Sequence, residues 1–205
     1  MRALDGVTLS VPRGAFCVLT GPSGSGKTTL LSILGVLARP TTGHISFDGR
    51  ETDRFSEMEF TKIRGRIGWV FQGLALLPRL SIWENVSYPL IPRGIGRSER
   101  RRVAEELLVR LGLAAKSCAR PETLSGGEQQ RVAVARALVS KPDVVFADEP
   151  TSNLDPAACR VLALLLTEIH EAGTTVIVAS HDPEFLSRAS LHVELETGRL
   201  KTSAT

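Results

Sequence analysis

The chain has 205 residues, of which 42% are hydrophobic, and this is enough for one large α/β domain with a core of its own. Its 25 Lys and Arg against 22 Asp and Glu give a formal net charge of +3, which is too small and too evenly spread to favour nucleic acid as a partner. The cysteines form no C-x-x-C pair, which argues against a disulfide framework or a zinc site, and no apolar run is long enough to span a membrane.

The N-terminal part of the chain predicts short strands around one helix. Residues 7–11 alternate between apolar and polar side chains, which indicates a strand that pairs in a β-hairpin with a buried strand at 16–19. A helical pattern follows at 30–37. Beyond it we expect a strand at 44–47 with a turn at Asp48-Gly49, a helix at 56–64 and a strand at 66–71.

The sequence pattern from residue 73 to about 140 predicts mostly helices. One helix spans 98–111 and is closed by Gly112, and another begins at Ser125. Alternating strands and helices then return, which implies a parallel sheet with site residues at the carboxyl ends of its strands. We expect strands at 144–148 and 174–180, helices at 156–171 and 182–188, and a last strand pair near 192–200 that turns at Gly198.

The stretch from Gly21 to Thr28 has the spacing G-x-x-x-x-G-K-[ST] and lies between a predicted strand and a predicted helix. Glycines in this motif let backbone N–H groups turn inward around phosphate oxygens, and the helix N-terminus adds partial positive charge. Lys27 would reach the β- and γ-phosphates, and the Thr28 hydroxyl would ligate Mg²⁺. A chance Gly/Ser turn is the alternative. We predict nucleotide contacts from Gly21, Pro22, Ser23, Gly24, Ser25, Gly26, Lys27, Thr28 and Thr29.

Two acids, Asp148 and Glu149, end the apolar strand at 144–148. Carboxylates at the sheet edge that also carries the phosphate loop suit Mg²⁺ binding and the orientation of an attacking water. Asp148 suits the metal shell and Glu149 suits the general base. A strand that ends in a solvated Asp-Glu pair is common, so this prediction depends on the loop at 21–28.

Together these motifs predict an α/β fold: a P-loop NTPase core with a mostly parallel sheet, an N-terminal antiparallel β subdomain and an inserted α-helical subdomain. We expect one domain over residues 1–205. Its nucleotide-binding core would comprise 1–72 and 141–205, and its helical subdomain about 73–140.

The string LSGGEQQR at 124–131 places Ser125, Gly126 and Gly127 at a predicted helix start, where backbone N–H groups can bind an anion. An ordinary N-cap is the alternative. With both nucleotide motifs, this string resembles the signature of ATP-binding-cassette (ABC) ATPases, and the resemblance covers the chain from Leu4 to about Leu200. It implies that ATP is bound with Mg²⁺ and hydrolysed.

The resemblance also assigns residues outside these motifs. Gln72 matches the Q-loop glutamine, which contacts Mg²⁺ and water, and His181 matches the switch histidine, which hydrogen-bonds the γ-phosphate. Asp155 matches the D-loop aspartate at a dimer interface. Two cassettes of this family close head to tail, so the phosphate loop of one subunit would face Ser125–Gly127 of the other across ATP.

Within the family, the residues around Gln72 and Asp148 are similar to cassettes of lipoprotein release, macrolide export and cell division. Ser152 departs from the glycine expected there. The resemblance implies a cytoplasmic ATPase subunit, peripheral on the inner face of the cell membrane, that forms a homodimer and drives a separate membrane permease. The alternative is a non-transport, cell-division-type cassette that signals through a membrane partner.

Two further expectations concern the surface. Leu76 and Leu80 belong to an excess of leucines between Gly73 and Ile82, which suggests a groove for a helix of the membrane subunit. The family's adenine-stacking aromatic residue would precede Met1, and Phe16 should be buried instead. Two expectations follow. Either the nucleotide site binds ATP weakly and discriminates poorly between bases, or the natural chain begins further upstream, and we favour the longer chain.

Overall fold

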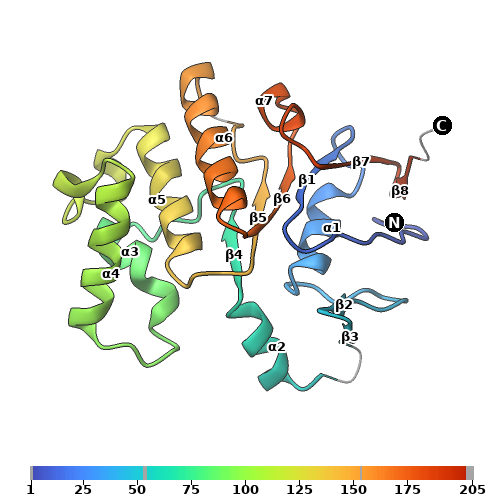
Figure 1. The fold of residues 1–205 in the computed structure, drawn as a ribbon, viewed down its shortest axis with the longest axis horizontal. Coiled ribbons are helices and arrows are strands. Elements are labelled where there is room, and N and C mark those ends of the chain that lie inside the picture. The colour runs from blue at the N-terminus through green and yellow to red at the C-terminus, as the bar shows by residue number, and fades with distance from the viewer. Residues whose placement is uncertain (1, 53–54, 153, 202–205) are drawn as a thin grey trace.

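A six-stranded sheet forms the centre of the protein, with strand order β4-β5-β6-β1-β7-β8 (Figure 1). The structure is a computed structural model that describes residues 2–52, 55–152 and 154–201. The first five strands of that order are parallel and β8 is antiparallel to β7, so the predicted α/β class and mostly parallel sheet are confirmed. The strands are β1 (Phe16–Thr20), β4 (Ile67–Val70), β5 (Val144–Asp148), β6 (Thr175–Ala179), β7 (Leu191–Glu196) and β8 (Arg199–Leu200).

A separate two-stranded antiparallel sheet consists of β2 (Ser46–Phe47) and β3 (Arg50–Glu51). The turn between them is Asp48-Gly49, where both residues have positive φ, 52° and 73°. That is the backbone shape of a tight two-residue hairpin, and it accounts for the Asp-Gly pair that predicted the turn.

Residues 7–11 do not form the predicted strand, so the expected hairpin with β1 is wrong. Their alternation does describe burial: Val7, Leu9 and Val11 are half-buried against the core, whereas Thr8 and Ser10 are exposed. A strand also needs a ladder of backbone hydrogen bonds to a neighbour, and side-chain alternation does not supply one. The antiparallel β structure of this region is β2–β3.

Seven α-helices lie within the described residues: α1 (Lys27–Leu34), α2 (Glu57–Arg64), α3 (Ile82–Ser87), α4 (Arg97–Arg110), α5 (Gly126–Leu138), α6 (Pro156–Glu171) and α7 (Pro183–Leu186). Three 3-10 turns join them: η1 (Tyr88–Leu90), η2 (Ala114–Lys116) and η3 (Pro121–Thr123). Ser56 and Ser125 begin α2 and α5 with capping boxes that fix where these helices start. The short α3 was not predicted.

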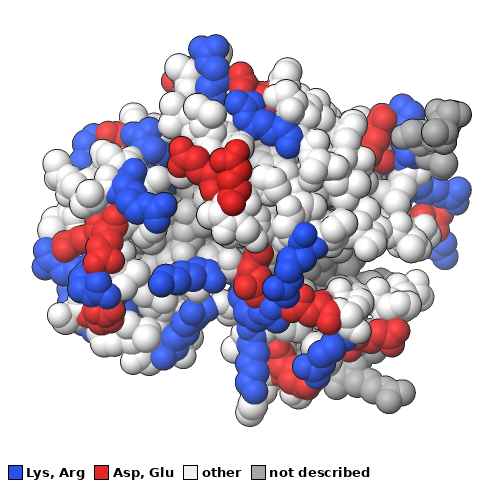
Figure 2. Space-filling model, viewed as in Figure 1, with Lys and Arg blue, Asp and Glu red and all other residues white. Residues whose placement is uncertain are grey.

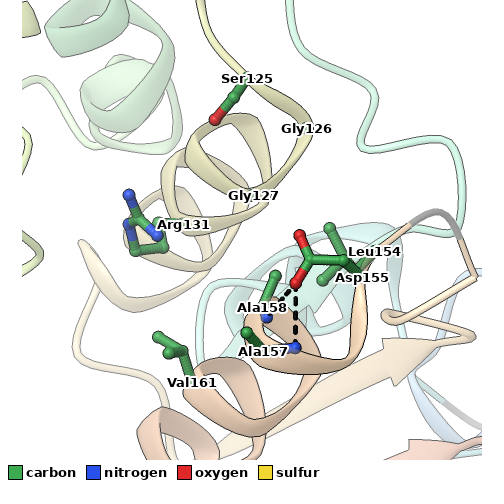
Figure 3. A pocket seen from close by; sticks show the side chains of 9 residues that line it. All are labelled: Ser125, Gly126, Gly127, Arg131, Leu154, Asp155, Ala157, Ala158 and Val161. Carbon is green, nitrogen blue, oxygen red and sulfur yellow. Dashed lines mark hydrogen bonds between the residues drawn. The ribbon is translucent and has the colours of Figure 1, made fainter.

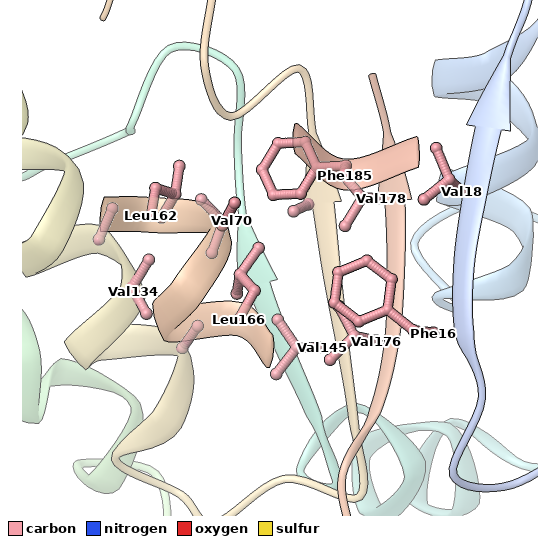
Figure 4. Packing of buried hydrophobic residues seen from close by; sticks show 14 residues of the cluster. Phe16, Val18, Val70, Val134, Val145, Leu162, Leu166, Val176, Val178 and Phe185 are labelled. Carbon is pink, nitrogen blue, oxygen red and sulfur yellow. The ribbon is translucent and has the colours of Figure 1, made fainter. Parts of the chain in front are cut away.

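The sheet is covered on both faces because successive strand residues point to opposite sides. Phe16 and Val18 of β1 belong to a cluster with α5, α6 and α7, and Figure 4 shows these side chains packed between helix and sheet. Cys17 and Leu19 belong to the cluster on the other face, beneath α1 and α2. Phe16 is fully buried, as expected.

Helices α3, α4 and α5 form a third cluster. Helix α5 joins this cluster to the sheet: Val132 and Ala135 face α3 and α4, whereas Val134 packs against the sheet. The division into a core and a helical subdomain at about 73–140 stays a prediction. None of the helices in the described part of the chain is long and apolar enough to cross a membrane.

The arginine-rich start of α4 is a solvated helix face. Arg102 pairs with Glu99 and Glu106, and Arg101 pairs with Glu105. Figure 2 shows positive and negative side chains interspersed on the face in view. Arg97 pairs with Glu84 of α3, and Arg100 donates to the Ile95 carbonyl oxygen, so each arginine of the run has a partner within the protein.

Candidate functional site

Three parallel strands end side by side and bring the predicted site residues together. Leu19 of β1 and Asp148 of β5 are both in register with Ala179 of β6. The chain then leaves β1 into the phosphate loop, β5 into Glu149 and β6 toward His181. The carboxyl ends of parallel strands meet at one edge of the sheet, so residues distant in sequence become neighbours.

Lys27 is the centre of this group and its side chain is only 9% exposed. Its Nζ donates hydrogen bonds to the carbonyl oxygens of Gly21 at 2.6 Å and Pro22 at 3.2 Å. The same Nζ lies 3.4 Å from Nε2 of His181 and 3.8 Å from Oε1 of Glu149. One ammonium group therefore contacts the loop and the ends of two strands.

The loop from Gly21 to Gly26 has a backbone that only glycine adopts without strain. Gly21, Gly24 and Gly26 have φ of 140°, 77° and 103°. A Cβ on Gly21 would lie 2.1 Å from the carbonyl oxygen of Leu195, so β7 closes one side of the loop. The loop leads directly into α1, whose first backbone N–H groups have no partner within the helix.

Asp148 is 7% exposed, and its Oδ1 has no hydrogen-bond partner among the described residues. An unpaired buried carboxylate oxygen is costly, so a cation ligand would stabilise it. No group of three or more acidic, His or Cys side chains in the described part of the chain could hold a metal.

Glu149 has a φ of 42°, in the left-handed region that is unfavourable for a side chain of this size. Its backbone N–H donates to the carbonyl oxygen of Ala179 at 2.8 Å, which holds this turn of the chain against β6. Oε1 of Glu149 lies 4.0 Å from Nε2 of His181. Strain of this kind is held where the surrounding structure fixes it, often at functional sites.

Other predicted residues lie at or near the same edge. Thr28 is exposed and Thr29 half-buried at the start of α1. Pro22 and Ser23 are exposed on the loop, and Ser25 is buried beneath it. Gln72 is exposed two residues after β4, the strand next to β5. Among the hydrogen bonds of the described residues, none joins Gln72 to Lys27, Glu149 or His181.

The signature residues form a second group away from Lys27. The Ser125 hydroxyl accepts from the Glu128 backbone N–H, and the Glu128 carboxylate accepts from the Ser125 N–H at 2.9 Å. A hydrogen bond from Lys116, assisted by the one from Ser125, lowers the pKa of Glu128 to about 2. Ser125, Gly126 and Gly127 thus begin a well-capped helix, in which Ser125 and Gly126 are exposed and Gly127 is half-buried.

Asp155 lies beside Ser125, Gly126 and Gly127 in the same chain. The sequence did not predict that these residues are neighbours. The Asp155 carboxylate caps α6 by accepting from the N–H groups of Ala157 and Ala158, each at 2.9 Å (Figure 3). The starts of α5 and α6 line one hollow of about 390 Å³, and Lys27 is not among its lining residues. The lining consists of Ser125, Gly126, Gly127, Arg131, Leu154, Asp155, Ala157, Ala158 and Val161.

The chain matches known protein families and individual proteins over most of its length. Residues 4–152 match the family described as "ABC transporter", and residues 120–187 match "AAA domain, putative AbiEii toxin, Type IV TA system". The chain is 44% identical over 202 residues to an uncharacterized ABC transporter ATP-binding protein of Thermotoga maritima, covering 98% of this chain and 86% of that protein.

Relatives with assigned names and one solved structure are also ATP-binding proteins or cassettes. The lipoprotein-releasing system ATP-binding protein LolD of Bordetella avium is 45% identical, over 98% of this chain and 88% of that protein. The macrolide export ATP-binding/permease protein MacB of Hyphomonas neptunium is 42% identical, over 98% of this chain but 31% of that protein. The cassette MJ0796, solved as a dimer in a post-hydrolysis state with ADP and Pi, has a TM-score of 0.90 at 39% identity, covering 98% of this chain and 89% of that one.

Proposed function

The chain belongs to the ABC transporter family and is an ATPase, and from this premise we propose that it is the ATP-hydrolysing subunit of a transporter that couples ATP-driven dimerisation to a separate membrane permease. The observation that carries the proposal is the position of Lys27, which joins the phosphate loop to Glu149 and His181. The relatives named for lipoprotein release and macrolide export support transport of that kind.

Binding of the triphosphate falls to the loop from Gly21 to Thr28 and to Thr29. Its glycine-dependent backbone can direct N–H groups inward. The ammonium group of Lys27, which here donates to the carbonyl oxygens of Gly21 and Pro22, can instead donate to phosphate oxygens. The charge of Lys27 would offset the negative charge of the β- and γ-phosphates.

Mg²⁺ would be held by Asp148, Thr28 and Gln72. The buried, unpaired Oδ1 of Asp148 supports this assignment for the carboxylate, and Thr28 is exposed at the start of α1. Bound there, Mg²⁺ would supply neutralisation of phosphate charge. Gln72 would reach this group from the end of the neighbouring strand.

Hydrolysis would depend on Glu149 and His181. The carboxylate of Glu149 would accept a proton from the attacking water as general base. Lys27 and His181 both lie within 4.0 Å of its Oε1, so its position is restricted from two sides. His181, whose side chain is 54% exposed, can donate a hydrogen bond from its ring to the γ-phosphate.

Dimerisation would complete the site. Ser125, Gly126 and Gly127 line a hollow together with Asp155, and Lys27 does not line it. A helix start with free N–H groups favours an anion. A second copy of the chain would therefore bring Ser125–Gly127 and Asp155 to the ATP held by the first copy, as the dimeric solved structure supports.

The membrane partner would contact the region around the end of β4. Phe71 and Tyr88 are exposed, 36% and 46%, and line a hollow of about 320 Å³ with mostly apolar walls. Leu76 and Leu80, which the sequence favoured, are both half-buried, and Leu76 packs against the core clusters. A cytoplasmic position, peripheral on the inner face of the membrane, follows from this role.

The test combines hydrolysis with assembly. Purified chain should hydrolyse MgATP, and Glu149→Gln should be dimeric by light scattering with MgATP and monomeric without it. Reconstitution in vesicles with the membrane subunit encoded beside it should then raise the rate of hydrolysis. A chain that hydrolyses no ATP, or a trapped variant that stays monomeric with MgATP, would contradict the proposal.

A further inference from the structure

The peptide between Ser25 and Gly26, in the phosphate loop, is held from outside by a turn at the far end of the chain. The backbone N–H of Gly198 donates to the carbonyl oxygen of Ser25 at 3.0 Å. In a trans peptide the C=O and the next N–H point in opposite directions. The bond from Gly198 therefore keeps the N–H of Gly26 pointing away from the turn, as phosphate binding by such a loop requires.

That turn joins β7 to β8 through only two residues, Thr197 and Gly198. Thr197 and Gly198 have φ of 49° and 79°, and the flanking residues Glu196 and Arg199 are paired. This is a two-residue hairpin turn in the left-handed region, where glycine is favoured at the second position. The orientation of the Gly198 N–H is consequently well defined.

The N-terminal segment fixes the turn in place. The Asp5 N–H donates to the Gly198 carbonyl oxygen at 2.8 Å, and the Asp5 carboxylate accepts from Nη2 and Nε of Arg199 at 2.6 and 3.1 Å. This ion pair with Arg199 lowers the pKa of Asp5, and Arg2 adds a weaker contribution. The segment thus binds the turn through backbone and side chain.

The same segment also touches the loop. A Cβ on Gly26 would lie 2.6 Å from the Ala3 carbonyl oxygen, and one on Gly198 would lie 2.8 Å from that oxygen. One carbonyl therefore packs against both the loop and the turn. Figure 1 shows the N-terminal end of the chain next to β8 and α1.

We propose that residues 3–5 and the Thr197-Gly198 turn form a latch that positions the phosphate loop, with Asp5, Gly198 and Arg199 as positioning residues for nucleotide binding. The inference rests on the proposed role of the loop at 21–28. Because the latch orients a backbone N–H that faces phosphate, it changes the affinity for triphosphate, leaves the hydrolytic step unaltered and acts equally on ATP and GTP.

The experiment measures dissociation constants for MgATP and MgGTP, kcat and the melting temperature on the full chain. Asp5→Asn and Arg199→Gln each break an exposed ion pair, so affinity should fall about two- to fivefold with kcat unchanged. Gly198→Ala should weaken binding about tenfold, because it strains the turn and crowds Ala3. Exchange of the charges, Asp5→Arg with Arg199→Asp, should restore affinity.

Two matched controls separate the latch from general stability. Lys201→Met breaks the Lys201–Glu194 pair of 2.9 Å on the same hairpin, and Gly112→Ala strains a glycine of similar φ, 70°, that has open space around it. Neither should change nucleotide affinity. Arg199 is 70% exposed, so its substitution leaves the core intact.

The outcomes are distinguishable. Unchanged affinity in Asp5→Asn and Gly198→Ala, with binding lost in Lys27→Ala, would overturn the latch and keep the phosphate-loop assignment. A change in the ratio of ATP to GTP affinity would also overturn it, because the segment would then act on the base. A wild-type chain that binds no nucleotide would overturn the proposed function together with the latch.

Discussion

Nζ of Lys27 lies 3.8 Å from Oε1 of Glu149, so the first residue of α1 and the residue after β5 meet at the edge of the sheet. One side chain is a cation and the other an anion, and they are 9% and 24% exposed. We propose that they serve successive steps, binding and hydrolysis, and this separates the first two predictions.

Glu149→Gln should keep MgATP binding and slow hydrolysis by roughly 10²- to 10⁴-fold, because the amide cannot accept the proton of the attacking water. Single-turnover hydrolysis with labelled ATP measures this directly. Glu196→Gln, at an exposed position on β7, is the matched control and should hydrolyse normally. Wild-type turnover in Glu149→Gln would remove Glu149 from the role of base.

Lys27→Ala should instead weaken MgATP binding by about 10- to 100-fold, the size of a charge-assisted hydrogen bond. Equilibrium titration with a fluorescent ATP analogue is the measurement, and the melting temperature reports whether the loop stays folded without the contacts to Gly21 and Pro22. Normal ATP affinity in a folded Lys27→Ala variant would contradict the phosphate-loop assignment.

Gly35→Ala should destabilise the protein by about 1–3 kcal/mol, as overpacking of a core does. A Cβ there would lie 2.1 Å from the ring of Trp69, which cannot retreat because it stacks on Phe71 and Phe146. Urea denaturation measures the change. Gly73→Ala is the control, since a Cβ there meets nothing within 4 Å, and equal stability of the two variants would refute the argument.

The ion pair of Lys116 with Glu128 should make part of the stability depend on pH. The pKa of Glu128 is lowered from 4.5 to about 2, first by the hydrogen bond from Lys116, so the folded state favours the ionised carboxylate. This contribution is present above pH 4.5 and is lost as the pH falls toward 2. Lys116→Met should therefore melt below wild type at pH 6, by an amount that shrinks toward pH 3.

A double-mutant cycle with Glu128→Gln isolates that pair from the other effects of each substitution. The coupling between the two positions should be full at pH 6, reduced at pH 3 and nearly absent at about pH 2. A coupling that is the same at all three pH values would show that the carboxylate charge of Glu128 does not contribute through Lys116.

Tyr88→Glu should reduce stimulation of ATPase activity by the membrane subunit and leave basal activity unchanged, because it places a charge in the apolar hollow beside Phe71. The measurement is hydrolysis with and without the reconstituted partner. Val109→Glu, at a position on α4 that is 63% exposed and outside this hollow, is the control. Full stimulation of Tyr88→Glu would place the contact elsewhere.

The sequence predicted several elements closely because local signals specify them. The strand at 144–148 and the helix at 156–171 have the predicted bounds, and the expected helix start at Ser125 is confirmed by its capping box. Apolar runs, proline at a first helical turn and Ser-x-x-Glu boxes act over a few residues, so no knowledge of the remaining chain is needed.

The strand expected at 7–11 failed for the complementary reason. Alternation of Val7, Leu9 and Val11 determined which side chains face the core, but whether a backbone joins a sheet depends on a neighbour that these residues do not specify. The excess of leucines between Gly73 and Ile82 predicted a groove for a partner helix, and only packing decided that Leu76 lies half-buried against the core clusters while Tyr88 stays exposed.

The sequence by itself determined the chemistry available to this protein: a glycine-rich loop with Lys27, and a strand that ends in Asp148 and Glu149. The tertiary structure decided which groups meet. Parallel register brought Glu149 and His181 to Lys27, and the β7–β8 turn came to lie against Ser25 and Gly26 from the opposite end of the chain. Residue type fixes what a side chain can donate or accept, whereas distances between remote residues are set by strand order and packing, which no local pattern encodes.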